Sequence, residues 1–121
     1  MPYIFFTRQI HWICGYVLLC AVLAGSVTTS PLPAPGYVSH ADKFIHAGAY
    51  AVLGLWFGQL LTTAKYWALV TSLAAFGAAI ELVQFLLPHR TASVLDLLAN
   101  LVGLLIAVFI LRYLSKFGLY R

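Results

Sequence analysis

The chain has 121 residues, of which 63% are hydrophobic and only 8% are charged, and its formal net charge is +4. A soluble globular chain carries about 25% charged residues, so this composition excludes a soluble domain and indicates an integral membrane protein. The positive charge does not indicate a nucleic-acid partner, because the basic residues are scattered singly and form no basic run. The length fits a single membrane domain over residues 1–121.

Four apolar segments follow one another along the chain, at about 10–27, 44–61, 66–87 and 94–113. Each approaches the ~20 residues that a helix needs to cross the hydrocarbon core. The connection before the second segment is a loop, because three prolines lie within residues 31–35. The two later connections are short and predict antiparallel neighbours. We therefore predict an all-α polytopic membrane protein, an antiparallel bundle of four transmembrane helices.

Small residues inside these segments predict close helix packing. Gly54 and Gly58 form a GxxxG pattern in GLWFG, and AAFGAA lies in the third segment. Cys14 and Cys20 are six residues apart in one apolar segment, so they point to different sides of a helix. We interpret them as buried small apolar residues and expect neither a disulfide framework nor a metal pair.

Lysine and arginine predict the orientation in the membrane, since cytoplasmic loops are enriched in them. With the N-terminus inside, Lys43 and Arg90 fall on the outer side. The other five basic residues fall on the cytoplasmic side: Arg8, Lys65, Arg112, Lys116 and Arg121. Both termini are therefore expected in the cytoplasm. The first segment has a second interpretation as a signal peptide with a cleavage site at LAGS, although its apolar run exceeds the usual 7–15 or so residues.

The second segment begins with an unusual concentration of polar residues in the stretch DKFIHAGAY. Asp42, His46 and Tyr50 are spaced i, i+4, i+8. Lys43, His46 and Tyr50 are spaced i, i+3, i+7. Residues at these spacings share one face of a helix. This face is polar although the segment is otherwise apolar, so it should point into the bundle.

The third and fourth segments carry polar residues at the same predicted end of the bundle. Glu81 and Gln84 are spaced i, i+3 near the end of the third, and Arg90 follows. Asp96 and Asn100 are spaced i, i+4 near the start of the fourth. A charged group facing lipid costs at least about 2.5 kcal/mol. All three acidic side chains of the chain therefore converge on one interior site, predicted at the outer leaflet.

Structural roles are an alternative for most of these residues taken singly. Asp42 and Lys43 begin a span, where an acid suits the helix N-terminus and a lysine snorkels. Asp96 follows Ser93 as a first-turn acid near a helix cap. Glu81 has no such interpretation, because it lies deep in AAFGAAIELVQF. The remaining side chains also fit ordinary helix packing or interhelical hydrogen bonds: His46, Tyr50, Gln84 and Asn100.

The order of these polar residues resembles the VanZ-like family of small integral membrane proteins. DKFIHAGAY and ELVQFLLPHRTASVLDLLANLVG are similar to that family's D-K-x-x-H-x-x-x-Y and E-x-x-Q…R…D-x-x-x-N-x-x-G signatures, over about residues 42–103. The resemblance implies a protein of the bacterial cytoplasmic (inner) membrane connected with the cell envelope, because the founding member is associated with resistance to the glycopeptide teicoplanin. It implies site residues but no reaction: Asp42, Lys43, His46, Tyr50, Glu81, Gln84, Arg90, Asp96 and Asn100.

Binding of an envelope ligand is the first function that fits this site. A groove open to the outer leaflet, with Lys43 and Arg90 at headgroup depth, would hold a lipid phosphate or a glycopeptide-type ligand through charge-assisted hydrogen bonds. Gln84, Tyr50 and Asn100 would complete the ligand-binding set. The expected partner is a membrane lipid or a lipid-linked envelope precursor, without nucleic acid, and a homo-oligomer stays open.

Catalysis and transport are the two alternatives that the sequence leaves open. In a membrane-embedded enzyme acting on a lipid-linked substrate, His46 and Glu81 would be the acid/base pair, with Asp42 and Asp96 as further candidate catalytic groups. A metal variant would use the same four residues, but no metal-specific spacing such as H-E-x-x-H is present, so we expect no metal or other cofactor. A small transporter is disfavoured, because we expect no ionisable residue in the cytoplasmic half to continue a proton pathway.

Overall fold

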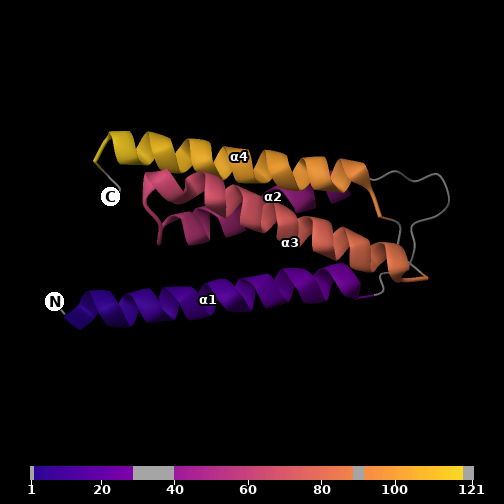
Figure 1. The fold of residues 1–121 in the computed structure, drawn as a ribbon, viewed down its shortest axis with the longest axis horizontal. Helices are drawn as coiled ribbons and strands as arrows, with labels where there is room; N and C mark the ends of the chain where they lie inside the picture. Colours follow the sequence, from indigo (N-terminus) through magenta and orange to yellow (C-terminus); the bar gives the residue numbers. More distant parts are fainter. Residues whose placement is uncertain (1, 29–39, 89–91, 119–121) are drawn as a thin grey trace.

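The computed structural model describes residues 2–28, 40–88 and 92–118, with side chains described from Thr7 onward. It contains four α-helices, α1 (Pro2–Val27), α2 (His40–Gly58), α3 (Tyr66–Leu86) and α4 (Val94–Lys116). A short 3-10 helix, η1 (Thr63–Lys65), joins α2 to α3. The described residues contain no strand. The predicted all-α class with four helices is confirmed (Figure 1).

Successive helices run in alternating directions, so that both chain ends lie at one end of the bundle (Figure 1). The end of α1, the start of α2, the end of α3 and the start of α4 therefore meet at the opposite end (Figure 1). This up-and-down topology follows from the short connections between α2, α3 and α4, which leave no length for a crossover. It brings the polar stretches of the sequence together.

The observed helix bounds differ from the predicted segments mainly in α1, α2 and α4. Helix α1 begins at Pro2, well before residue 10, and α4 continues to Lys116 beyond residue 113. Helix α2 begins before residue 44, with Asp42 in its first turn, where an acid suits the helix dipole. It ends at Gly58, because the N–H groups of Leu60 and Leu61 turn back to carbonyls three residues earlier. Hydropathy alone misses such polar helix ends.

Helices α2 and α4 approach each other most closely, because glycines line their contact. A Cβ atom on Gly103 of α4 would lie 2.9 Å from the carbonyl carbon of Ala47 and 3.0 Å from the amide nitrogen of Ala51. On the other side of the contact, a Cβ on Gly54 of α2 would lie 2.7 Å from the Cβ of Ala107. Small residues allow membrane helices to approach backbone to backbone. The predicted packing role of GLWFG agrees with this geometry.

Helix α1 is fastened to α2 by a reciprocal pair of hydrogen bonds. The ring Nε2 of His11 donates to the carbonyl oxygen of Trp56 at 2.9 Å, and the indole Nε1 of Trp56 donates to the carbonyl of His11 at 2.9 Å. The ring centroids of Trp12 and Phe57 lie 5.7 Å apart in the next layer. These contacts hold α1 near the end of the bundle that contains the termini.

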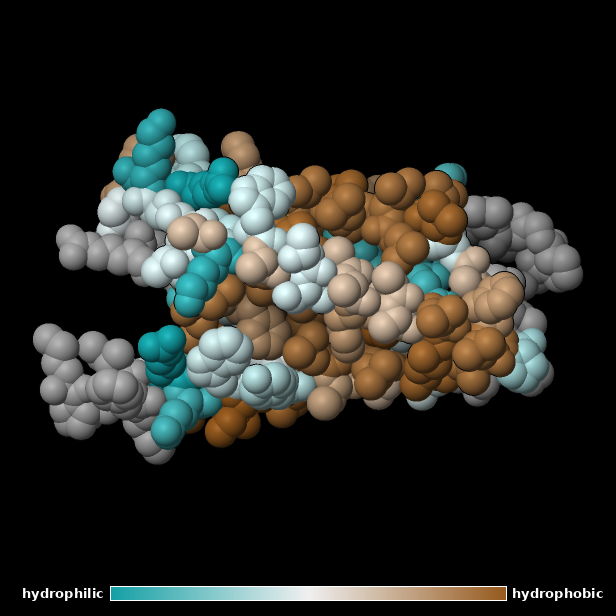
Figure 2. All heavy atoms as spheres, in the orientation of Figure 1, coloured by the Kyte–Doolittle hydropathy of each residue, from teal (hydrophilic) through white to brown (hydrophobic). Residues whose placement is uncertain are grey.

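The outer surface of the bundle is apolar, as a membrane protein requires. Five large apolar side chains on α2, α3 and α4 are 71% to 77% exposed: Phe44, Phe85, Leu86, Val94 and Phe109. Hydrophobic residues cover much of the face in Figure 2, and hydrophilic residues gather at the end that holds the termini. A surface of this kind faces lipid.

Three described segments are long and apolar enough to cross a membrane: Thr7–Val27, Thr63–Leu86 and Val94–Lys116. Helix α2 is not among them, because its 19 residues include the polar first turns that carry Asp42, Lys43 and His46. Its length is still about 28 Å at 1.5 Å per residue, close to the hydrocarbon thickness of about 30 Å. The chain is a multi-pass membrane protein.

Candidate functional site

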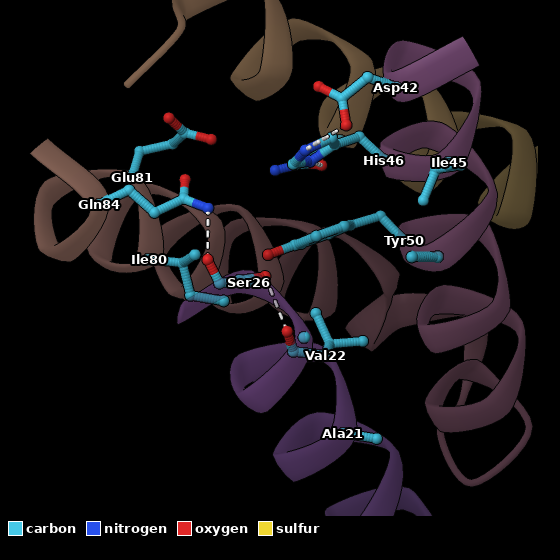
Figure 3. Close-up of a pocket in the computed structure, with 13 residues that line it drawn as sticks. Ala21, Val22, Ser26, Asp42, Ile45, His46, Tyr50, Ile80, Glu81 and Gln84 are labelled. Atoms are coloured by element: carbon cyan, nitrogen blue, oxygen red, sulfur yellow. Dashed lines mark hydrogen bonds and ion pairs between the residues drawn. The ribbon is translucent and has the colours of Figure 1, made fainter. Parts of the chain in front are cut away.

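A cavity of about 290 Å³ lies at the end of the bundle away from the termini (Figure 3). Helix α1 contributes a wall of small and apolar residues, and Ile45, Ala49 and Ile80 add further apolar surface. The polar lining comes from α1, α2, α3 and α4 together: Ser26, Asp42, His46, Tyr50, Glu81, Gln84 and Asn100. A ligand in this space would therefore meet one apolar side and one polar side.

The structure gathers eight of the nine predicted site residues at this end of the bundle, either in the cavity wall or bonded to it. The predicted shared face of α2 holds, since both His46 and Tyr50 line the cavity. Arg90 lies outside the described residues. His40, the first residue of α2, is exposed.

An ion pair between Lys43 and Asp96 ties α2 to α4. The ammonium of Lys43 donates a hydrogen bond to Oδ1 of Asp96 and lies 3.7 Å from Oδ2 of Asp42. Lys43 precedes the apolar run of α2, and its ammonium compensates the buried carboxylate of Asp96.

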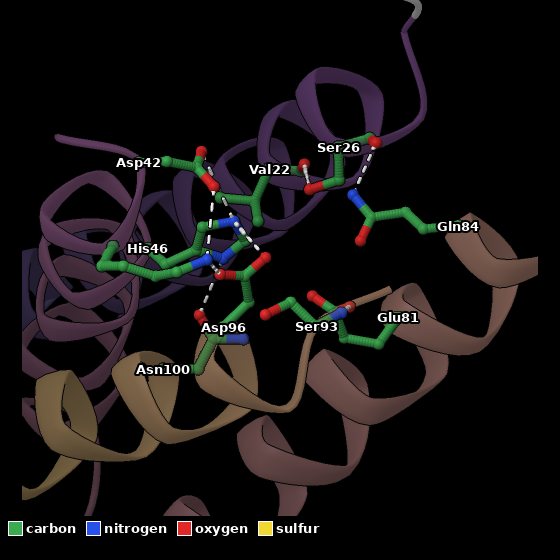
Figure 4. A network of polar contacts seen from close by, with 10 residues as sticks. Val22, Ser26, Asp42, His46, Glu81, Gln84, Ser93, Asp96 and Asn100 are labelled. Atoms are coloured by element: carbon green, nitrogen blue, oxygen red, sulfur yellow. Dashed lines mark hydrogen bonds and ion pairs between the residues drawn. The ribbon is translucent and has the colours of Figure 1, made fainter. Parts of the chain in front are cut away.

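Asp96 lies in the first turn of α4, as the capping alternative requires. Ser93 is the N-cap residue by position, but its side chain makes no capping hydrogen bond. The carbonyl of Ser93 instead accepts the N–H of Asp96 at 3.0 Å. The carboxylate of Asp96 points across to α2 (Figure 4), so the first-turn acid serves an interhelical contact.

His46 lies between the two aspartates and Asn100 (Figure 4). Its Nδ1 lies 3.1 Å from Oδ1 of Asn100, which can only accept, so Nδ1 carries the hydrogen. Its Nε2 lies 3.9 Å from Oδ1 of Asp42 and 3.7 Å from Oδ2 of Asp96. The imidazole is therefore oriented by Asn100, with Nε2 aimed at carboxylate oxygens.

Glu81 is held by one oxygen and leaves the other without a partner. Its Oε2 accepts the backbone N–H of Ser93 at 2.9 Å, whereas Oε1 is buried and has no hydrogen-bond partner. Among the described side chains, the hydroxyl of Tyr50 is the second buried polar group without a hydrogen-bond partner. Gly77 makes room for it, because a Cβ there would lie 2.9 Å from the tyrosine oxygen and 3.0 Å from Nδ2 of Asn100.

Two contributors to this region, Ser26 and Ser93, were not anticipated as site residues. The carbonyl of Ser26 at the end of α1 accepts the amide Nε2 of Gln84 at 2.8 Å, and Ser93 supplies its backbone N–H. Both contacts use the backbone, so no side-chain pattern in the sequence indicates them. His11 lies outside this region, in the half of the bundle that holds the termini, and it corrects the expectation that this half has no ionisable residue.

Comparison with known protein families gives a match over most of the chain. A family model described as VanZ/LLP1 matches residues 3–115, which include all of the described site residues. No curated protein and no solved structure matches the chain. The predicted resemblance is confirmed, and the chain belongs to the VanZ/LLP1 family.

Proposed function

We propose that this protein binds the polar headgroup of a cell-envelope lipid, a lipid-linked phosphate or a glycopeptide-type ligand, in the cavity between the four helix ends. The observation that carries this proposal is the pair of unpartnered polar atoms in the cavity wall. Tyr50 and Glu81 are only 2% and 5% exposed, and each has a side-chain oxygen without a hydrogen-bond partner.

Leaving such groups unpartnered is unfavourable by about 1–3 kcal/mol each, so a ligand that satisfies both gains affinity. The hydroxyl of Tyr50 is a donor for a phosphoryl oxygen, and Oε1 of Glu81 is an acceptor for a sugar or glycerol hydroxyl. A lipid headgroup offers both kinds of atom. The cavity volume of about 290 Å³ suits a headgroup and leaves the acyl chains beside the apolar helices.

The charge distribution supports a headgroup site in the outer leaflet. Among the described lysines and arginines, four lie at the end of the bundle that holds the termini: Arg8, Lys65, Arg112 and Lys116. Lys43 is the described basic residue at the cavity end. Because cytoplasmic segments are enriched in basic residues, the termini belong in the cytoplasm in this proposal and the cavity faces the outside.

Retention of native lipid by the purified protein tests the binding proposal. Mass spectrometry of the protein released from detergent should show a bound lipid of defined headgroup. Tyr50→Phe removes the free donor, and Glu81→Gln removes the acceptor charge while keeping an oxygen for Ser93. Both variants should lose most of the bound lipid.

Tyr16→Phe is the matched control, because Tyr16 lies on α1 with an exposed ring and does not line the cavity. This variant should retain lipid like the wild type. Equal lipid retention in wild type, Tyr50→Phe and Glu81→Gln would contradict the proposal.

An enzyme acting on a lipid-linked substrate is the second candidate, favoured by one observation. His46 and Glu81, an imidazole and a carboxyl group, line the same cavity and are available as an acid/base pair. Turnover of the bound lipid by the wild type, lost in both His46→Ala and Glu81→Gln, would establish catalysis. Stable retention of unchanged lipid supports binding alone.

A further inference from the structure

We infer that Asp42, His46 and Asp96 form a binding site for a divalent cation beside the lipid-headgroup cavity. One ligand atom from each residue lies within 4.8 Å of the others. The three residues come from the start of α2 and the start of α4, so the two helices that pack most closely hold the site in place. Figure 4 shows the imidazole between the two carboxylates.

The separations suit a cation better than they suit direct contacts between the side chains. Nε2 of His46 lies 3.9 Å from Asp42 and 3.7 Å from Asp96, both longer than a hydrogen bond. Ligand atoms of a tetrahedral zinc site lie about 3.4 Å apart, because its bonds are about 2.1 Å long. The side chain of Asp42 is 54% exposed, so its rotation can shorten its distances to the other two ligands.

The hydrogen bond from His46 to Asn100 prepares the imidazole for a metal. Since Oδ1 of Asn100 accepts the hydrogen of Nδ1, the lone pair of a neutral imidazole stands on Nε2, which faces both carboxylates. A lone pair aimed at anionic oxygens is unfavourable unless a cation lies between them. Histidines that bind metals almost always donate their other ring N–H to an oxygen in this way.

The balance of charge at this end of the bundle also favours a cation. The described residues here include three carboxylates, those of Asp42, Glu81 and Asp96, against the single ammonium of Lys43. Lys43 contacts Oδ1 of Asp96 and leaves Oδ2 facing His46. The unpartnered Oε1 of Glu81, buried in the same cavity, is an independent sign that a positively charged or hydrogen-donating group belongs there.

Two carboxylates and one imidazole match the preferences of Zn²⁺ or Mn²⁺. Such a cation would attract a headgroup phosphate into the cavity. The cation site nevertheless does not depend on the proposed lipid function, because the metal alone is its probe. Cation binding without lipid retention would contradict the headgroup proposal and leave the cation site intact.

Isothermal titration of the full chain in detergent, with its affinity tag removed, tests the site with Zn²⁺ and with Mn²⁺ in the presence of excess Mg²⁺. The wild type should bind one cation per chain. His46→Gln and Asp42→Asn should each weaken binding by at least about tenfold, and Asn100→Ala, which frees the imidazole, by about 10- to 100-fold. Lys43→Met should strengthen binding several-fold, because it removes the competing ammonium.

His40→Ala is the matched control, since this exposed histidine lies on the same first turns of α2 outside the cluster. It should bind the cation as the wild type does. Absence of binding to the wild type, or equal affinity in His46→Gln and Asp42→Asn, would overturn the inference, and so would an equal loss in His40→Ala. Helix content by circular dichroism identifies any variant that has lost its fold. Because Asp42 is exposed, Asp42→Asn should fold even if His46→Gln does not.

Discussion

Substitution of Gly103 by alanine should separate α2 from α4 and disturb the site that these helices hold. An added Cβ would lie 2.9 Å and 3.0 Å from backbone atoms of Ala47 and Ala51, and closer still to the carbonyl oxygen of Ala47. An ordinary contact of this kind is 3.4–4 Å. Because backbone atoms cannot rotate away, the two helices must move apart by at least about 0.5 Å.

Overpacking of this kind destabilises a protein by about 1–3 kcal/mol, and the same shift lengthens the contact between Lys43 and Asp96. Unfolding of purified Gly103→Ala in a detergent–denaturant titration should therefore occur at a lower midpoint than in the wild type. Its affinity for a divalent cation should fall too, since the ligands of that site come from both helices.

Gly48→Ala is the matched control, because it lies on α2 with nothing within 4 Å of the added Cβ. It should unfold no earlier than the wild type, since alanine favours a helix over glycine. An unchanged midpoint for Gly103→Ala, or an equal loss in Gly48→Ala, would refute the packing argument.

Two further predictions concern orientation and the buried carboxyl group. In a cysteine-free background, a cysteine at the exposed Ala92 should react with an impermeant thiol reagent added outside intact cells. A cysteine at the exposed Ala64 should not react. The opposite pattern would reverse the proposed topology. Glu81→Ala loses the hydrogen bond from Ser93 and should lower the free energy of unfolding by about 1–3 kcal/mol, less than the 2–5 or so expected for Leu104→Ala. Lipid retention should nevertheless be lost in Glu81→Ala and kept in Leu104→Ala at equal amounts of folded protein, and the reverse would give Glu81 a purely structural role.

The number and order of the helices could be predicted from the sequence, because hydropathy and helix length are local properties. Four apolar segments of near-spanning length, separated by a proline-rich connection and two short ones, leave little choice but an antiparallel bundle. The polar end of α2 was predicted less well. Its first turn carries Asp42 and Lys43, which lower local hydropathy although they belong to the helix.

The gathering of these polar residues at one end of the bundle could also be predicted to a large extent. Residues at i, i+4 and i+8 share a helical face wherever the helix lies, and an ionisable group in an apolar segment must point inward. These two arguments bring together Asp42, His46, Tyr50 and Glu81. Arg90, predicted with them, lies outside the described residues.

The pairing of these groups depends on how each helix is rotated and shifted against its neighbours, and no spacing along the chain specifies that. The contact of Gly103 with Ala47 sets the depth at which α4 meets α2, and therefore joins Asp96 to Lys43 and Asn100 to His46. Backbone groups cannot be identified from side-chain patterns at all. The partner of Glu81 is the N–H of Ser93, so which oxygen of Glu81 is left without a partner follows from tertiary packing.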